Sequence, residues 1–219
     1  IRSKGEEMKV FFQVCSQSDD VGNTLLLKTI EKGHLPTVQW LVDKSDLLVE
    51  NRCHETSLHL ACGSGDLELV KWLVEDKKLK NMINNVTIRK ASCLHYAAVN
   101  GHVDIVEWLL KIDNNLLTLK DSSGHSCILA ASRAGQLDVV KYLSENHDCD
   151  INDVNAGGNN CIHLALRSKN LDLVQWLYYE KECSMSSKNS DGNTGFHIAA
   201  VSGDWDIVQW AFSVCDNIE

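Results

Sequence analysis

Proline is nearly absent from this chain, and so are the usual signs of a boundary, a membrane span or a leader. The 219 residues contain one proline, Pro36, and no Pro-, Ser- or Gly-rich linker, so nothing in the composition divides the chain into separate domains. No apolar run approaches membrane-spanning length, and the charged start IRSKGEEMKV lacks the apolar segment of a secretory signal. Because the first residue is Ile1 rather than methionine, we expect an excised piece of a longer protein.

Positive charge is also scarce. Lys and Arg total 21 against 30 Asp and Glu, which gives a net charge of −9. Nucleic acids and anionic membranes attract positive surfaces, so we expect neither as a partner. An apolar fraction of 44% with 23% charged residues is ordinary for a folded globular chain and argues against disorder. Nine cysteines, an odd number, suit a reducing compartment, so we expect the cytoplasm, or the host cytoplasm if the chain is a secreted effector.

What the sequence does contain is an internal repeat. The stretch HETSLHLACGSGDLELVKWLV recurs with variation six times, and every copy aligns without an internal gap. The copies begin 32, 36, 34, 34 and 34 residues apart, at Gly22, His54, Lys90, Gly124, Gly158 and Gly192.

Each copy predicts two short helices. The third residue of each copy is a good N-cap type, namely Thr24, Thr56, Ser92, Ser126, Asn160 and Thr194. A glycine then ends the first helix, except in the fifth copy, where Lys169-Asn170 stands instead and Asn170 is expected to take the turn. A second helix follows, with a valine and usually a leucine three residues later on one apolar face.

These features resemble the ankyrin repeat family, whose pattern is roughly D-x-x-G-x-T-P-L-H-x-A-A-x-x-G-H. The match is closest at Asp191 to Ala200, and no copy has the proline after the threonine. The resemblance implies an all-α fold, an ankyrin-repeat solenoid of paired antiparallel helices with short β-hairpin or turn links. We expect one continuous array made of an N-terminal capping helix at 1–18 and repeats at 19–50, 51–86, 87–120, 121–154, 155–188 and 189–219. Near its end, Trp205, Trp210 and Phe212 are expected to be exposed, which favours continuation of the array or a packed neighbour.

Histidines and cysteines offer a catalytic or metal-binding alternative. Cys93-x-His95 and Cys161-x-His163 lie two repeats apart, roughly 16–20 Å for helices packed at 8–10 Å, which is too far to share a zinc ion. In the family this histidine is structural and ties neighbouring turns by hydrogen bonds. No phosphate loop, H-E-x-x-H or nucleophile elbow is present. We therefore expect no metal, no cofactor and no enzyme activity in this chain, and intrinsic Cys-His catalysis is the minor alternative.

The resemblance also implies where a partner binds, because ankyrin partners usually meet the hairpin tips and the concave face of the first helices. In this chain those positions hold Arg52, Glu55, Arg89, Asn100, His125, Arg133, Asn159, Arg167 and Asn193. Four of the five arginines fall in this set, one in each of four successive repeats. Because Arg pairs well with carboxylate and phosphate groups, they predict a basic stripe for an acidic or phosphorylated segment of a protein partner. The alternative is that they are scattered surface charges.

A recurring aromatic position in the second helix is a candidate for a second binding surface. It holds Trp40, Trp72, Trp108, Tyr142, Trp176 and Trp210, which we call the aromatic ladder. The ladder is either packing between repeats or a second binding surface. The expected function is protein–protein interaction. The alternative is that the array recruits substrates or host targets for a larger enzyme or secreted bacterial effector, whose catalytic domain lies outside this sequence.

Overall fold

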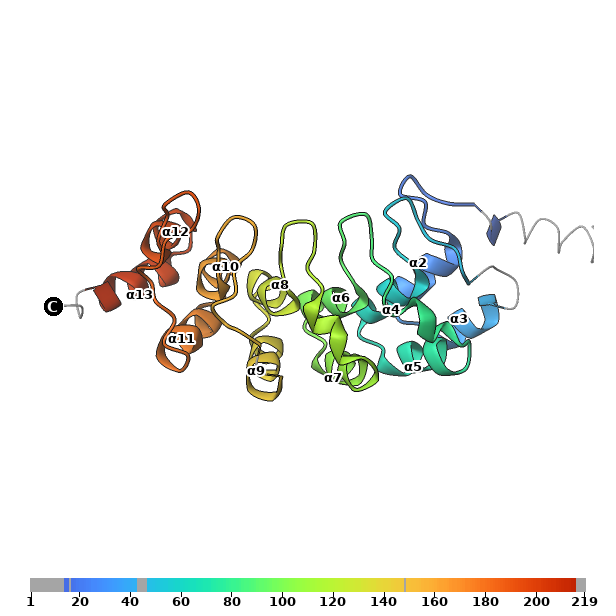
Figure 1. Ribbon diagram of the computed structural model, residues 1–219. Coiled ribbons are helices and arrows are strands. Elements are labelled where there is room, and N and C mark those ends of the chain that lie inside the picture. Colours follow the sequence, from blue (N-terminus) through green and yellow to red (C-terminus); the bar gives the residue numbers. More distant parts are fainter. Residues whose placement is uncertain (1–13, 16, 43–46, 148, 216–219) are drawn as a thin grey trace, which may run out of the picture.

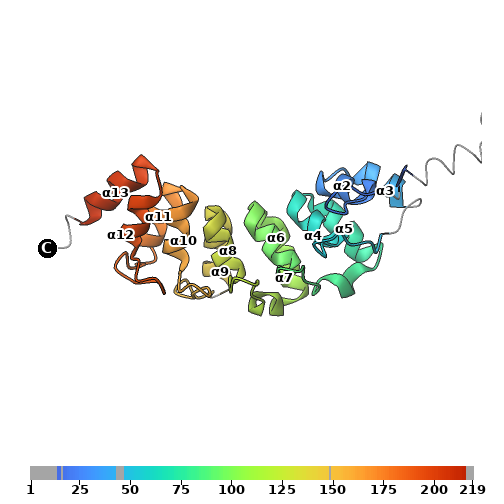
Figure 2. The same ribbon diagram turned by 90° about the horizontal axis from the view of Figure 1, so that it is seen from above.

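The computed structural model describes residues 14–15, 17–42, 47–147 and 149–215. They form a row of six helix pairs, which Figures 1 and 2 show as a shallow arc. The capping helix expected at 1–18 lies almost wholly outside the described residues; of it, only Val14 and Cys15 are described as helical.

The two helices of each pair lie in two layers, one above the other in Figure 1. The first helices are α2 (Leu25–Glu31), α4 (Ser57–Ser64), α6 (Cys93–Asn100), α8 (Cys127–Ala134), α10 (Cys161–Ser168) and α12 (Gly195–Val201). The second helices are α3 (Leu35–Val42), α5 (Leu67–Glu75), α7 (Val103–Ile112), α9 (Leu137–Asn146), α11 (Leu171–Tyr179) and α13 (Trp205–Cys215). Two 3₁₀ helices that the repeat pattern did not indicate, η1 (Leu79–Met82) and η2 (Asn114–Thr118), follow α5 and α7.

Each first helix begins at the predicted N-cap residue. Thr56, for example, has an extended backbone and its hydroxyl accepts the N–H of His59, while the His59 ring accepts the N–H of Thr56. This reciprocal capping box satisfies two backbone donors that a helix start leaves unpaired. The same box forms at Ser92 with His95, Asn160 with His163, and Thr194 with His197. A local capping requirement therefore explains the Thr-x-x-His spacing of the repeat.

The capping histidines also join one repeat to the next. In three of the four, the second ring nitrogen donates to a backbone carbonyl that leads into the next repeat: His59 Nε2 to Asn85 O at 3.1 Å, His95 to His125 O at 3.0 Å, and His163 to Ser187 O at 3.0 Å. These bonds confirm the structural role that the resemblance implied. Burial lowers the pKa of all three imidazoles from the usual 6.5.

Several first helices end at a glycine in the left-handed conformation, but the fifth repeat differs from the sequence prediction. Lys169 takes the left-handed position there, with φ of 63°, and Asn170 does not. The side chain of Asn170 instead accepts the N–H of Leu173 at 3.1 Å to begin α11, and donates to the carbonyl of Gly135 at 2.7 Å. The repeat register places Asn170 at the start of the second helix, where its amide has both a cap and a neighbouring repeat to bond.

Capping at the second helices varies between repeats, and Asp66 provides a test. Its carboxylate accepts the N–H of Leu69 at 3.0 Å. Replacing Asp66 by Ala is expected to lower the free energy of unfolding by about 1 kcal/mol, because that helix start loses its side-chain acceptor. Urea unfolding of Asp66→Ala and the cap-preserving Asp66→Asn measures the effect, and equal stabilities of the two variants would contradict the capping role.

The links between repeats are hairpin-shaped turns with little β-pairing. Within the described residues they contain only isolated bridges, at Ser18–Thr24, Glu50–Thr56 and Val86–Ser92. Each tip is bonded to the next by one backbone N–H···O=C bond of 2.7–3.1 Å. The five bonds, which we call the hairpin ladder, are Arg52 N to Val21 O, Ile88 N to Cys53 O, Ser122 N to Arg89 O, Ala156 N to Ser123 O, and Ser190 N to Gly157 O. Successive tips therefore stack in a fixed register and offer one continuous surface.

Candidate partner-binding surface

The hairpin tips and the first helices together form one surface along the array, which we call the groove face. It is the surface on which the resemblance placed the partner. Because each tip is bonded to its neighbour and a histidine caps four of the six first helices (α4, α6, α10 and α12), the backbone under this face is held in place before any partner binds.

The four arginines lie at two levels of the groove face. Arg52 and Arg89 are exposed in hairpin tips, whereas Arg133 and Arg167 are exposed in the last turns of α8 and α10. An eight-residue helix rises about 12 Å, so the two pairs do not form the single line that a stripe implies. Among the described residues none of the four forms an ion pair, and the guanidinium of Arg52 donates only to the backbone carbonyl of Asp20, at 2.8 Å.

Glu55 and Asn100 are held by the same aromatic residue. The half-buried carboxylate of Glu55 accepts the hydroxyl of Tyr96 and, at 2.6 Å, the amide of Asn51. The exposed Asn100 donates from Nδ2 to the carbonyl of Tyr96 at 2.9 Å. These bonds orient both side chains beside the Tyr96 ring.

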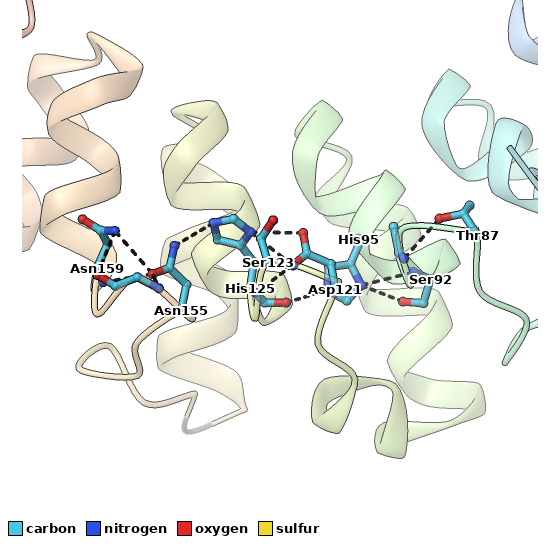
Figure 3. Close-up of polar contacts among 10 residues, drawn as sticks. Thr87, Ser92, His95, Asp121, Ser123, His125, Asn155 and Asn159 are labelled. Atoms are coloured by element: carbon cyan, nitrogen blue, oxygen red, sulfur yellow. Dashed lines mark hydrogen bonds and ion pairs between the residues drawn. The ribbon is translucent and has the colours of Figure 1, made fainter. Parts of the chain in front are cut away.

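His125 and Asn159 are buried, contrary to the expectation that they are displayed to a partner. Their exposed fractions are 5% and 7%. Figure 3 shows the cause for His125, whose ring is bonded to the next hairpin: Asn155 Nδ2 donates to His125 Nε2 at 3.0 Å. In the same way Asn189 Nδ2 donates to Asn159 Oδ1 at 3.0 Å. Both residues occupy the hairpin position that the repeat pattern assigned to them. In these two repeats, however, the side chain at that position bonds the next hairpin instead of facing outward.

Asn193 is half-buried at the same position of the last repeat. Its backbone N–H is accepted by the side chain of Asn189 at 2.9 Å. No later repeat follows it within the described residues, so its side chain faces no further hairpin of the kind that buries Asn159.

A cavity of about 490 Å³ interrupts the groove face between the third and fourth repeats. It is lined by Ala91, His95, Tyr96, Val99, Asn100, Asp121, His125, Ala130, Arg133 and Ala134. The sequence interpretation missed it. The signal was an alanine at two repeat positions that carry a larger side chain in every other copy.

Asp121 supplies a charged carboxylate at this cavity. Burial alone raises the pKa of such a group, but bonds from the backbone N–H and ring Nδ1 of His125 and from the N–H of Ser123 outweigh it, so the pKa of Asp121 lies below 3.8. Since Nδ1 of His125 donates to Asp121 and Nε2 accepts from Asn155, the hydrogen bonds fit the neutral imidazole (Figure 3).

Cysteines and the aromatic ladder serve mainly packing. None of the nine cysteines, all of which lie among the described residues, forms a disulfide. Burial raises the pKa of Cys161 to about 12 and that of Cys183 to about 11, which opposes a nucleophilic thiolate. Among the described residues no group of three His, Cys, Asp or Glu could hold a metal ion. Four ladder residues pack half-buried against the core: Trp72, Trp108, Tyr142 and Trp176.

The two ends of the ladder differ. Trp40 is 53% exposed, whereas Trp210, expected to be exposed, is only 8% exposed, because it packs edge-on against Tyr178 and Tyr179. Trp205 and Phe212 are exposed as expected, at 69% and 67%. Burial at most ladder positions favours packing over a second binding surface.

The geometry defines a helical-repeat solenoid whose units bury their apolar faces against each other. A family model for ankyrin repeats, three copies long, matches residues 4–85, 26–121, 77–155 and 94–189. The chain therefore belongs to the ankyrin repeat family.

Among characterised proteins, the chain is similar to the transient receptor potential cation channel subfamily A member 1 of Drosophila melanogaster. The two are 28% identical over 123 residues, which is 49% of this chain and 10% of the channel protein. The match thus spans about a tenth of that relative's length. No helix in the described ranges is both long and apolar enough to span a membrane.

Proposed function

We propose that this array binds a partner protein through the groove face and that the bound segment is acidic or phosphorylated. Ankyrin repeats are protein–protein interaction modules, so the partner class follows from the family. The charge of the segment is inferred from one observation: Arg52, Arg89, Arg133 and Arg167 are exposed on the groove face without ion pairs among the described residues, although the chain carries a net charge of −9.

Unpaired guanidinium groups favour an anionic segment for a physical reason. Each presents a planar fork that bonds a carboxylate or phosphate by two parallel N–H···O bonds. Because the arginines lie at two levels, the segment would cross from the hairpin tips toward the far ends of the first helices, from Arg52 and Arg89 to Arg133 and Arg167. The second candidate, recruitment of a target for a catalytic domain elsewhere in a longer protein, uses the same surface and is consistent with a relative ten times longer than the match.

Charge reversal tests the proposal. Tagged wild-type chain and Arg89→Glu/Arg133→Glu are used to capture partners from cell lysate, after both show the same circular dichroism and unfolding midpoint. The reversed variant is expected to retain at least tenfold less of the partner, because interface arginines often contribute more than about 1 kcal/mol each. Phosphatase treatment of the lysate distinguishes a phosphorylated segment from an acidic one.

Lys111→Glu/Lys141→Glu is the matched control. It makes the same change in net charge on the second helices α7 and α9, away from the groove face, and should bind like wild type. Equal capture by all three proteins would place binding elsewhere, at the exposed Trp40 or at an end of the array.

A further inference from the structure

We propose that the cavity between the third and fourth repeats receives an aromatic side chain with a hydrogen-bond donor, a tyrosine or tryptophan of the partner protein, followed closely in that partner by an acidic residue that pairs with Arg133. This inference rests on the proposed function, because it names the anchor residue that the same groove face would take.

The cavity arises from two alanines on opposite sides of one repeat junction. Ala91 occupies the position that holds Asn23, Glu55, His125, Asn159 and Asn193 in the other repeats. Ala130 occupies the position that holds Lys28, Leu60, Tyr96, Leu164 and Ile198. At other junctions these positions supply atoms that fill the groove or bond the next hairpin, as Asn23 and Asn159 do. With both side chains reduced to methyl groups, this junction is left open.

The walls are largely apolar and already ordered. Tyr96 forms one wall, and its ring is fixed by the bond from its hydroxyl to Glu55 and by an edge-on contact with His59 at 5.3 Å between centroids. Val99, 42% exposed, and the methyl groups of Ala130 and Ala134 complete the apolar lining. A cavity of this size and lining suits a large flat side chain, and an aromatic ring stacking on Tyr96 gains more than area burial alone.

The two ends carry opposite charge. At the hairpin end, Asp121 Oδ1 accepts the N–H groups of Ser123 and His125, both at 2.8 Å. Within the described ranges, Asp121 Oδ2 accepts only the His125 ring, at 3.0 Å. A carboxylate oxygen has about two acceptor sites, so one site on Oδ2 remains for a ligand donor. At the far end of α8, Arg133 makes no hydrogen bond or ion pair within the part of the chain that the structure describes.

These ends select the occupant. A purely apolar side chain would cover the open acceptor of Asp121 without bonding it, which leaves a desolvated acceptor unsatisfied and weakens binding. A lysine or arginine would bond Asp121 but would bring a second cation into a cavity that Arg133 already lines at its other end. A tyrosine hydroxyl or tryptophan N–H donates to Asp121 without charge, and leaves Arg133 free for a carboxylate from the next residues of the partner.

A random 12-residue peptide library displayed on phage, selected on the 219-residue chain, tests the proposal. Each selected peptide is then measured on Ala91→Asn/Ala130→Leu, which fills the cavity with residues that other repeats carry at the same positions. We expect peptides with Tyr or Trp within three residues of Asp or Glu, binding the filled variant at least tenfold more weakly than wild type. Replacing that Tyr or Trp by Phe in the peptide should weaken binding to wild type about tenfold, the loss of one bond to a charged group.

Controls separate filling from general perturbation. Ala200→Leu makes the same alanine-to-leucine change as Ala130→Leu, at an exposed first-helix position of the last repeat. This variant should bind the peptides like wild type. If the double variant unfolds at a lower temperature than wild type, the single variant Ala91→Asn replaces it.

Peptides that bind the filled variant as tightly as wild type, or that share Lys, Arg or aliphatic residues instead, overturn the proposal, and so does a selection that yields no binder. Acidic peptides that tolerate the filling but are lost on Arg89→Glu/Arg133→Glu would remove the cavity anchor and leave the proposed function standing.

Discussion

Lowering the pH from 7.5 to 5 is expected to destabilise this array strongly. His59, His95 and His163 are buried, and burial holds each imidazole's pKa below the 6.5 of an exposed histidine. Below about pH 6.5 the unfolded chain binds protons that the native chain does not, so stability present above that pH is lost as the pH falls toward the folded pKa values. Three such groups give a slope of at most about 4 kcal/mol per pH unit.

The hydrogen bonds explain why the native state resists these protons. In His95, Nδ1 accepts the N–H of Ser92 at 3.3 Å while Nε2 donates to His125 O, so a second ring proton would meet a donor. Guanidinium unfolding at pH 7.5, 6.5, 5.5 and 5.0 measures the slope. Single variants His59→Gln, His95→Gln and His163→Gln should each reduce it by about a third, since Gln at this position keeps a capping box without titrating.

His197→Gln is the control, because His197 holds the same capping position but is exposed. It should show the wild-type dependence on pH. A wild-type profile that stays flat between pH 7.5 and 5.5 would contradict the assignment of these histidines as buried neutral caps.

The second large effect is expected at a hairpin glycine. Gly158 has φ of +70°, and a Cβ there would lie 2.8 Å from both the backbone N and the Oγ of Ser190 in the next hairpin. That nitrogen donates the Ser190–Gly157 bond of the hairpin ladder, at 3.0 Å. Gly158→Ala is therefore expected to cost about 2–5 kcal/mol, as left-handed strain plus an overpacked contact.

Gly192 separates the two contributions. It has φ of +79° at the same position of the last repeat, and a Cβ there would meet no atom within 4 Å. Gly192→Ala should cost only the strain, about 1–2 kcal/mol. Urea unfolding of both variants gives the difference, and equal losses would show that the contact between hairpins adds nothing to stability.

The helix pairs and caps follow from sequence because they depend on residues a few positions apart. Thr56 and His59 lie three residues apart, so their spacing alone predicts where α4 begins. Neighbours across repeats are also predictable in outline, since a constant period places equal positions side by side. The bonding role of the histidines, in contrast, was implied by the resemblance to the ankyrin family and did not follow from the period alone.

What the sequence did not predict depends on pairs of side chains from different repeats. His125 matches a displayed position of the family, yet a bond from Asn155 in the next repeat draws it inward. The cavity requires two alanines that are 39 residues apart, Ala91 and Ala130, and neither alone distinguishes a gap from a filled junction. Lys169 takes the left-handed turn because the capping and bridging bonds of Asn170 commit that residue to the next helix.

The hairpin ladder also has a consequence for how the chain reaches its fold. Each of its five bonds joins residues only 31 to 35 positions apart, and the main helix contacts join neighbouring repeats. Low contact order of this kind means that little loop-closure entropy is lost before a contact forms. Two adjacent repeats can therefore nucleate anywhere along the chain, and order can spread from them in both directions, one repeat at a time, without waiting for the chain ends to meet.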